Sequence, residues 1–398
     1  MTTLPLLHPL SAACHPQPYA YYAQLQEGDA LRWFPDLKLW VASRAAAVEA
    51  VLASPLCAVR PQAEKIPAAI AGSSAAQIFD QLIRMNEGDA HAIPKRVLQT
   101  TLRSLDMTRI AQRTACFADQ LATATRPFDG AALTHWTHAL PVYVVGDMLG
   151  FSADELPALH HWIKDFVQCL SPLSNAAQLQ DASVAAEKLL QRFGDLVRQH
   201  VRPPDADADF ITRVQREAQS AGWDHCKALL CNLIGLLSQT YEASAGLIGN
   251  ALVLLHQRPE LQAYLATEAP GAAWLSLVEE VCRIDSPVQN TRRFVEQDCV
   301  IAGVQLRRGD AVLLLLAAAN RDPLANPDPA NFAMQRSQRR LYSFGHGRHA
   351  CPGQTLALGI AAAALPGLLH AHPSLLHTAL QWHYRPSLNG RIPQFTQA

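Results

Sequence analysis

The feature of this sequence that most limits its fold is a long apolar run, Trp223 to Gln257, that contains no proline. Its apolar residues recur at helical spacing and the run stops just before Pro259, so it predicts one helix over about 223–257. At a rise of about 1.5 Å per residue, such a helix crosses most of a domain, and the remaining elements have to pack around it. The centre of the run, "SQTYEAS", is polar and contains Glu242. An acid inside an apolar helix indicates a functional group, a polar break in a membrane span or an exposed surface.

Composition narrows the possible classes of protein. The chain has 398 residues, of which 49% are apolar and 17% charged, and this is typical of a globular protein with a sizeable core. The 33 Lys and Arg residues nearly balance the 34 Asp and Glu residues, so no overall charge favours nucleic acid or an anionic membrane surface. Nine scattered cysteines without a Cys-x-x-Cys pair indicate a reduced, cytoplasmic protein.

Targeting and membrane segments are not expected. The N-terminal residues show no signal peptide, because no basic segment precedes a long apolar one. The apolar run from Ala228 meets Glu242 before it reaches the roughly 18 residues that a span needs. A second apolar stretch, before His370, is expected to be broken by Pro366 and Gly367.

The remaining patterns predict a mainly α-helical protein with small β-sheets, an α+β fold in one domain over 1–398. A hairpin is expected within Ala30–Ser43, and helices dominate from Ser104 to His256. Further expected features are breaks near Ser171–Pro172 and Pro203–Pro204, a helix pair from Pro259 to about Asp285, short strands around turns at Gly303 and Arg308–Asp310, a last helix from about Pro352 and a hairpin turn at Asn389–Gly390.

The segment "FGHGRHACPGQ" places Cys351 directly before the last helix, with Pro352 expected at the first helical position. A thiolate there faces the positive end of the helix dipole and free backbone N–H groups. A cysteine in this position is most often structural. His346, His349 and Cys351 are also candidate zinc ligands, although no second cluster with zinc spacing accompanies them.

The whole string favours a different interpretation. Its residues Phe344, Gly345, Gly347, His349, Cys351 and Gly353 resemble, position by position, the haem-binding loop of the cytochrome P-450 superfamily. The resemblance implies the fold of that family, with haem b (iron protoporphyrin IX) held by the axial thiolate of Cys351. It also places Phe344, Gly345, His349 and Gly353 beside the cofactor.

Other segments follow in the order of that family. Glu280 and Arg283 lie three residues apart on one helix face, which alone is an ordinary surface pair, but they resemble the family's Glu-x-x-Arg motif, whose third partner would be Arg336. "AANRDP" at 318–323 resembles the family's strand-to-coil signature.

Two segments resemble those that hold the haem propionates. In "SPVQNTRRF", Arg293 matches the arginine that contacts a propionate, with Arg292 as the alternative. In "MNEGDAHAIPKRV", His91 matches a histidine of the family, whereas Lys95 stands where the family has arginine, so the bidentate fork is lost. Pro94 inside this helix is unusual.

In the same resemblance, the polar centre of the long helix lies over the distal face of the haem. The family pattern Ala-Gly-x-acid-Thr falls on residues 239–243. Glu242 keeps the acid, Ala243 lacks the threonine hydroxyl, and Thr240 replaces the glycine. Three solutions stay open for the water that delivers protons: Thr240 or Gln239 holds it, the substrate supplies a hydroxyl or amide, or the reaction needs no full monooxygenase cycle.

The resemblance implies an oxidoreductase that activates O2 to hydroxylate or couple a compact polar small molecule in secondary-metabolite biosynthesis. Expected pocket residues are Val288, Gln289, Asn290 and Asn389 together with Gln239 and Thr240. Substrate-facing segments are expected at about 61–85, 168–180, 236–243, 288–293 and 388–392. A peroxide-driven or non-redox enzyme and a non-catalytic haem sensor are the alternatives.

The resemblance also implies how electrons arrive. They come ultimately from NAD(P)H through a ferredoxin or similar partner and its reductase, and Lys95, Arg103 and Arg348 are candidates for the docking patch. We expect a cytoplasmic monomer that binds neither nucleic acid nor membrane.

Overall fold

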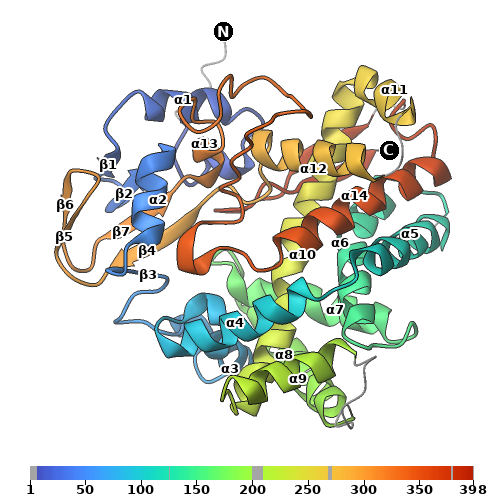
Figure 1. The fold of residues 1–398 in the computed structure, drawn as a ribbon, viewed down its shortest axis with the longest axis horizontal. Coiled ribbons are helices and arrows are strands. Elements are labelled where there is room, and N and C mark those ends of the chain that lie inside the picture. Colours follow the sequence, from blue (N-terminus) through green and yellow to red (C-terminus); the bar gives the residue numbers. More distant parts are fainter. Residues whose placement is uncertain (1–6, 125, 200–208, 268–270, 378–379, 398) are drawn as a thin grey trace.

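The computed structural model describes residues 7–124, 126–199, 209–267, 271–377 and 380–397 and is mainly α-helical with three small sheets, which confirms the predicted fold class (Figure 1). The α-helices are α1 (Tyr19–Gln26), α2 (Ala45–Ala53), α3 (Ser74–Gln81), α4 (Asp89–Arg103), α5 (Met107–Ala124), α6 (Gly130–Met148), α7 (Leu156–Phe166), α8 (Ala176–Gln199), α9 (Phe210–Ser220), α10 (Cys226–Gln257), α11 (Pro259–Thr267), α12 (Ala272–Ile284), α13 (Leu316–Ala319) and α14 (Gln354–Ala371). Short 3₁₀ helices are η1 (Ala12–Cys14), η2 (Ala68–Ile70), η3 (Ile83–Met85), η4 (Val167–Leu170) and η5 (Gly347–His349). The strands are β1 (Leu31–Phe34), β2 (Leu39–Ala42), β3 (Cys57–Ala58), β4 (Thr291–Val295), β5 (Cys299–Ile301), β6 (Val304–Leu306), β7 (Ala311–Leu314), β8 (Gln381–Tyr384) and β9 (Pro393–Gln397).

The predicted long helix is confirmed as α10, which has 32 residues and is therefore about 48 Å long. It runs through the middle of the molecule, and α3, α6, α7, α8, α12 and α14 all pack against it (Figure 1). Two glycines bring the C-terminal segment close to it: a Cβ on Gly246 would lie 3.0 Å from the carbonyl oxygen of Arg391, and one on Gly249 would lie 3.0 Å from Pro393 Cδ. Helix α10 is thus the axis of the core.

The largest sheet has five strands in the order β1-β2-β7-β4-β3. The predicted hairpin is confirmed, because β1 pairs antiparallel with β2 from Leu31↔Ala42 to Phe34↔Leu39. Strand β2 runs parallel to β7, and β4 runs antiparallel to β7 with Arg293 opposite Val312. The predicted strands around Gly303 are confirmed as the β5–β6 pair.

The C-terminal hairpin differs in its turn. Strands β8 and β9 pair antiparallel and end at Tyr384↔Pro393, so residues 385–392 form a long loop in place of the predicted two-residue Asn389–Gly390 turn. Gly390 instead forms an isolated bridge with Val288. The loop therefore lies against the segment that leads from α12 to β4.

Two predictions about the last helix are wrong. It begins at Gln354, so Pro352 precedes it, and it continues through Pro366 and Gly367 to Ala371. Proline removes only one backbone hydrogen bond, and packing of α14 on α5 and α12 is enough to keep the helix intact. Within the described residues, α14 is the one helix that is long and apolar enough for a membrane span, with 39% of its 18 residues buried. The predicted break at Pro203–Pro204 lies outside the described residues, and the single domain stays a prediction.

Candidate active site

Cys351 lies between η5 and α14, on a loop whose backbone needs glycine. Gly345 and Gly347 have positive φ angles of 71° and 65°, which favour glycine over other residues. The N–H of Cys351 donates to the carbonyl oxygen of Phe344 at 2.7 Å and closes the loop. Burial raises the pKa of the Cys351 thiol, while the Gly353 N–H and Lys95 act in the opposite direction, yet the side chain is accessible. A sulfur that is both desolvated and accessible faces a space inside the molecule.

A stripe of accessible residues marks one face of α10. Gln239 is exposed and Leu236, Thr240 and Ala243 are half-buried, whereas most other residues in the middle of this helix are buried. Their spacing of three and four residues places all four on one side of the helix. Because α10 is surrounded by other helices, this side also faces an internal space.

The polar groups of this stripe are held by the helix itself, and the neighbouring Glu242 is held by one distant arginine. Gln239 Nε2 donates to the Gly235 carbonyl at 2.8 Å, and Thr240 Oγ1 donates to the Leu236 carbonyl at 2.7 Å. Thr240 Oγ1 keeps lone pairs that accept a hydrogen bond from water. The Glu242 carboxylate is ion-paired with Arg385 of the β8–β9 loop at 2.6 Å.

Ser244 does not replace the hydroxyl that Ala243 lacks. Its side chain is buried, so its hydroxyl is not among the accessible groups of the stripe. One residue along an α-helix is a rotation of about 100°, which is enough to move Ser244 off the face that Ala243 shares.

A group of basic side chains from α4, β4 and η5 surrounds Glu87. The rings of His91 and His349 lie 4.0 Å apart, and Glu87 pairs with His349 Nε2 at 3.1 Å and Arg348 Nε at 3.0 Å. Burial lowers the pKa of His91 to about 4 and that of Arg293 to about 10.

Two donors in this group are unused. His91 Nε2 and Arg293 Nε are buried and have no hydrogen-bond partner among the described residues. Buried donors normally have partners, so these two atoms fit an acidic group bound beside them. The carboxylates of a haem are groups of that kind.

The side chains of Lys95 and Arg348 are already used inside the molecule, so they are less available to a redox partner than the sequence indicates. Lys95 Nζ donates to the carbonyl oxygen of Ala350, directly beside Cys351. Arg348 donates to Glu87 and to the carbonyl oxygens of Ser54 and Cys57 at 2.8 Å each. Of the three residues expected in a docking patch, only Arg103 is exposed on the surface.

The zinc alternative does not hold. Among the described residues, no group of three or more His, Cys, Asp or Glu side chains is arranged to hold a metal ion. His349 is instead paired with Glu87, so His346, His349 and Cys351 do not form a zinc site.

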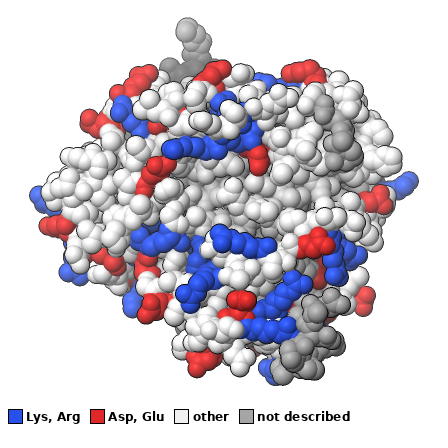
Figure 2. All heavy atoms as spheres, viewed as in Figure 1, with Lys and Arg blue, Asp and Glu red and all other residues white. Residues whose placement is uncertain are grey.

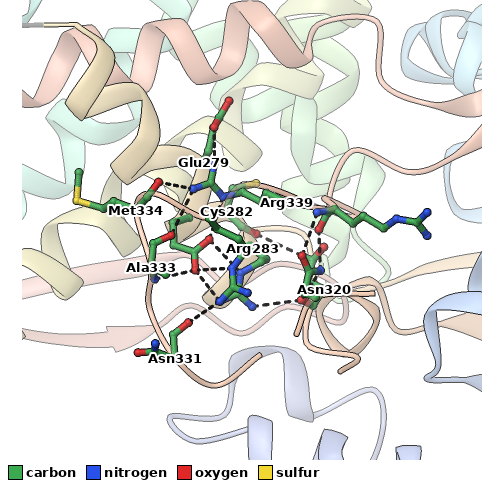
Figure 3. A network of polar contacts seen from close by, with 12 residues as sticks. Glu279, Cys282, Arg283, Asn320, Asn331, Ala333, Met334 and Arg339 are labelled. Carbon is green, nitrogen blue, oxygen red and sulfur yellow. Dashed lines mark hydrogen bonds and ion pairs between the residues drawn. The ribbon is translucent and has the colours of Figure 1, made fainter. Parts of the chain in front are cut away.

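Figure 3 shows a polar network that includes Arg283, Arg339 and Glu279. The carboxylate that Arg283 and Arg339 share is that of Glu280, which is fully buried together with Arg283. Arg283 reaches both carboxylate oxygens, at 2.7 and 3.0 Å. Arg336, the expected third partner, lies 3.4 Å from Glu280, whereas Arg339 lies 2.9 Å from it and also pairs with Glu279. Arg339 is therefore the closer third cation, and the sequence reasoning missed it. Arg283 and Arg336 also bind carbonyls of residues 327–331, so the network fixes the coil that leads to the Cys351 loop.

The expected polar pocket is wrong at Gln289 and Asn290. Gln289 is fully buried, and its amide is used by the Tyr22 hydroxyl at 2.9 Å and the Ser286 carbonyl at 2.6 Å. Asn290 is buried and donates to the Leu388 carbonyl at 2.8 Å. The Asn290 side chain thereby links the 285–290 and 385–392 segments. Val288 is half-buried and Asn389 is exposed, so these two keep accessible side chains, as Gln239 and Thr240 do.

This arrangement defines a class of protein: a helical fold with a desolvated but accessible cysteine before one core helix and an accessible face on the long central helix. The family model described as cytochrome P450 matches residues 276–372. The "Biotin biosynthesis cytochrome P450" of Bacillus subtilis (strain 168) is 31% identical over 254 residues, which are 64% of this chain and 63% of that protein. The "Vitamin D(3) 25-hydroxylase" of Pseudonocardia autotrophica is 28% identical over 90% of this chain and 87% of that protein.

Among solved structures, the fold is similar to that of P450BioI in complex with an acyl carrier protein carrying hexadec-9Z-enoic acid. The TM-score is 0.77 at 25% identity, over 95% of this chain and 97% of that one. The family model, the curated relatives and the solved structure all support the cytochrome P450 superfamily for this chain. That family implies a haem iron with a cysteine thiolate ligand. The sequence match to the Bacillus relative spans less than two thirds of that protein's length.

Proposed function

We propose that this protein is a haem-thiolate monooxygenase-type oxidoreductase that activates O2 to oxidise a small organic molecule. The observation that carries the proposal is Cys351, whose sulfur is accessible inside the molecule at the end of the glycine loop. Cys351 would be the axial ligand, with Phe344, Gly345 and Gly353 beside the cofactor. His91, His349 and Arg293 would bind its carboxylates through the unused donors His91 Nε2 and Arg293 Nε.

When bound, the haem supplies an iron centre whose thiolate ligand favours O–O cleavage. The protein supplies a covered site and the means to move protons. Glu242 accepts and releases a proton at its carboxylate, and Arg385 fixes the position of that carboxylate at 2.6 Å. Thr240 Oγ1 accepts a hydrogen bond from the water that Ala243 cannot hold, because its own proton is donated to Leu236. Lys95 stabilises the Ala350 carbonyl and, through it, the position of Cys351.

The axial ligand is tested with two cysteine variants. The reduced wild type with carbon monoxide should show the red-shifted Soret band of a thiolate-ligated haem. Cys351→Ser should lose this band, while the matched control Cys226→Ser, at an exposed cysteine at the start of α10, should keep it. A spectrum typical of histidine-ligated haem in the wild type would refute the proposal.

Electrons would come from NAD(P)H through a ferredoxin and its reductase. Figure 2 shows Lys and Arg side chains gathered on the face where Figure 1 shows α4 and the loop before α14. Since Lys95 and Arg348 are used internally, the exposed Arg96 and Arg103 on α4 are the better candidates for contacts with an acidic partner. Charge reversal at Arg96 and Arg103 should slow reduction by ferredoxin, more so at low salt, and leave reduction by dithionite unchanged. Equal ferredoxin rates in wild type and variant would exclude this patch.

A second function, a peroxide-driven or oxidative-coupling enzyme, is favoured by one observation. The hydroxyl is missing at Ala243, and the Thr240 hydroxyl proton is already used by the helix. Restoring the hydroxyl with Ala243→Thr distinguishes the two. Less peroxide released per electron consumed supports the monooxygenase. Loss of turnover with an identified substrate supports the specialised reaction.

The substrate remains a small molecule in this proposal, and a biosynthetic role is proposed because the Bacillus relative is named for biotin biosynthesis. A non-catalytic haem sensor would require that Glu242→Gln leaves all turnover intact. In this proposal the protein acts as a monomer in the cytoplasm.

A further inference from the structure

Arg84 has no role in the candidate active site described above. It lies in η3, between the buried Ile83 and the half-buried Met85, yet its own side chain is accessible. It makes no hydrogen bond or ion pair with any described residue. Burial lowers the pKa of Arg84, and Cys169 and Glu242 act in the opposite direction. Like Cys351, it is desolvated and accessible, so it faces an internal space.

The backbone around Arg84 is fixed against α10. The N–H of Ile83 donates to Asn232 Oδ1 at 2.8 Å, and Asn232 Nδ2 donates to the Gln81 carbonyl at 2.8 Å. Leu82 packs where a Cβ on Gly235 would be, 2.8 Å from that position. Asn86 closes the segment by donating to the carbonyl oxygens of residues 80 and 82.

The place where η3 packs is on the side of α10 that carries the proposed distal groups. Residues 232, 235, 239 and 242 fall within about 80° of one another around the helix. A long side chain at position 84 therefore extends along the face that carries Gln239 and Glu242. Cys169 of η4 is its other electrostatic neighbour. The Glu87 group, where the haem carboxylates are proposed to bind, is not among the groups that act on Arg84.

Glu242 does not neutralise Arg84. Its carboxylate is already paired with Arg385 at 2.6 Å. Arg84 is thus a positive charge without a direct partner, and because desolvation lowers its pKa, the unpaired charge is costly. A guanidinium presents a planar fork of donors that matches a carboxylate in a bidentate arrangement. Met85, next to Arg84 in the chain, and the accessible Leu236 and Ala243 on α10 are apolar and suit a hydrocarbon body.

We propose that Arg84 is the anchor for the carboxylate of an acidic substrate, and that it selects a free acid over the corresponding neutral amide. This rests on the proposed function, because it names the substrate class of the same site. It replaces the compact polar substrate expected from Gln289 and Asn290, whose amides are used by the backbone. Arg84 is a binding residue that fixes one end of the ligand and leaves its other end toward the cysteine side.

The probes are imidazol-1-yl alkanoic acids of graded chain length, each paired with its primary amide. The imidazole binds haem iron and reports through the Soret shift, while the tail reports on Arg84, and calorimetry measures the same affinities independently. In the wild type, the acid of matching length should bind more tightly than its amide. Arg84→Gln should weaken binding of the acid by about tenfold or more, because hydrogen bonds between charged groups are the strong ones. It should leave the affinity for the amide unchanged. Arg84→Lys should keep part of the preference.

The control Arg307→Gln changes an exposed arginine in the turn between β6 and β7 and should behave as the wild type. Three results would overturn the proposal: equal binding of acid and amide at every length, equal weakening of both in Arg84→Gln, or loss of haem from Arg84→Gln, which would make Arg84 a cofactor anchor. Plain imidazole and carbon monoxide spectra of the wild type separate these outcomes from a failure of the proposed function. That failure would remove the Soret response to every probe.

Discussion

Replacement of Glu280 by glutamine tests how much the buried network contributes to stability. Glu280 is fully buried and its carboxylate accepts from Arg283 at 2.7 and 3.0 Å, from Arg339 at 2.9 Å and from the Ala333 N–H at 3.0 Å. Glutamine keeps the shape but removes the charge and turns one acceptor into a donor, which then faces the guanidinium of Arg283 or Arg339. Breaking a buried ion pair costs about 3–5 kcal/mol, a large part of the roughly 5–15 kcal/mol that stabilises a typical protein.

The matched control is Glu279→Gln. Glu279 is partly exposed and contributes one ion pair, to Arg339, so its loss should cost about 1 kcal/mol or less. Urea unfolding followed by circular dichroism at equal haem loading measures both free energies. If Glu280→Gln unfolds at the same urea concentration as Glu279→Gln, the reasoning from burial is wrong. If Glu280→Gln cannot be purified folded, Arg339→Gln gives the test, with an expected cost of about 1.5–3 kcal/mol.

Three further predictions concern proton delivery, pH and packing. Ala243→Thr should lower the peroxide released per NAD(P)H consumed, measured with a ferredoxin and its reductase, and an unchanged ratio would mean that the missing hydroxyl is not limiting. Burial alone raises the pKa of Glu87, but hydrogen bonds from His349 and Arg348 outweigh it and lower the pKa to about 2. Glu87 therefore stabilises the fold fully above its unfolded pKa of about 4.3 and loses this effect as the pH falls toward 2, so Glu87→Gln should be less stable than the wild type at pH 7 and approach it in acid unfolding curves. Gly130→Ala should destabilise the protein by about 1–3 kcal/mol in urea unfolding, because its Cβ would lie 2.6 Å from the backbone nitrogen of Gln397; wild-type stability would mean that β9 moves aside freely.

Short-range sequence patterns were enough to predict most of the fold. Helix α10, the β1–β2 hairpin and the α11–α12 pair follow from apolar periodicity and from proline and glycine positions, which act over a few residues. The same local rule failed at Pro366, where packing on α5 and α12 carries the helix through. Tertiary contacts override a local preference when they contribute more than one lost hydrogen bond.

The polar residues of the site were harder to interpret. A glutamine or asparagine in a sequence does not reveal which atoms will use its amide. The Gln289 amide bonds Tyr22 and the Ser286 carbonyl, and the Asn290 amide bonds the distant Leu388 carbonyl. The partners Arg385 of Glu242 and Arg339 of Glu280 lie 143 and 59 residues away along the chain. No spacing rule in the sequence connects residues that far apart.

The sequence by itself determined the class of fold, the loop that carries Cys351 and the identity of the acid at position 242, because each depends on residues adjacent in the chain. Only the tertiary structure decided which charges are paired and which are not. It paired Glu242 with Arg385, used Lys95 and Arg348 inside the molecule, and left Arg84 without a partner among the described residues. The reason is physical: the energy of a charge depends on its distance to other charges and to water, and folding alone sets those distances.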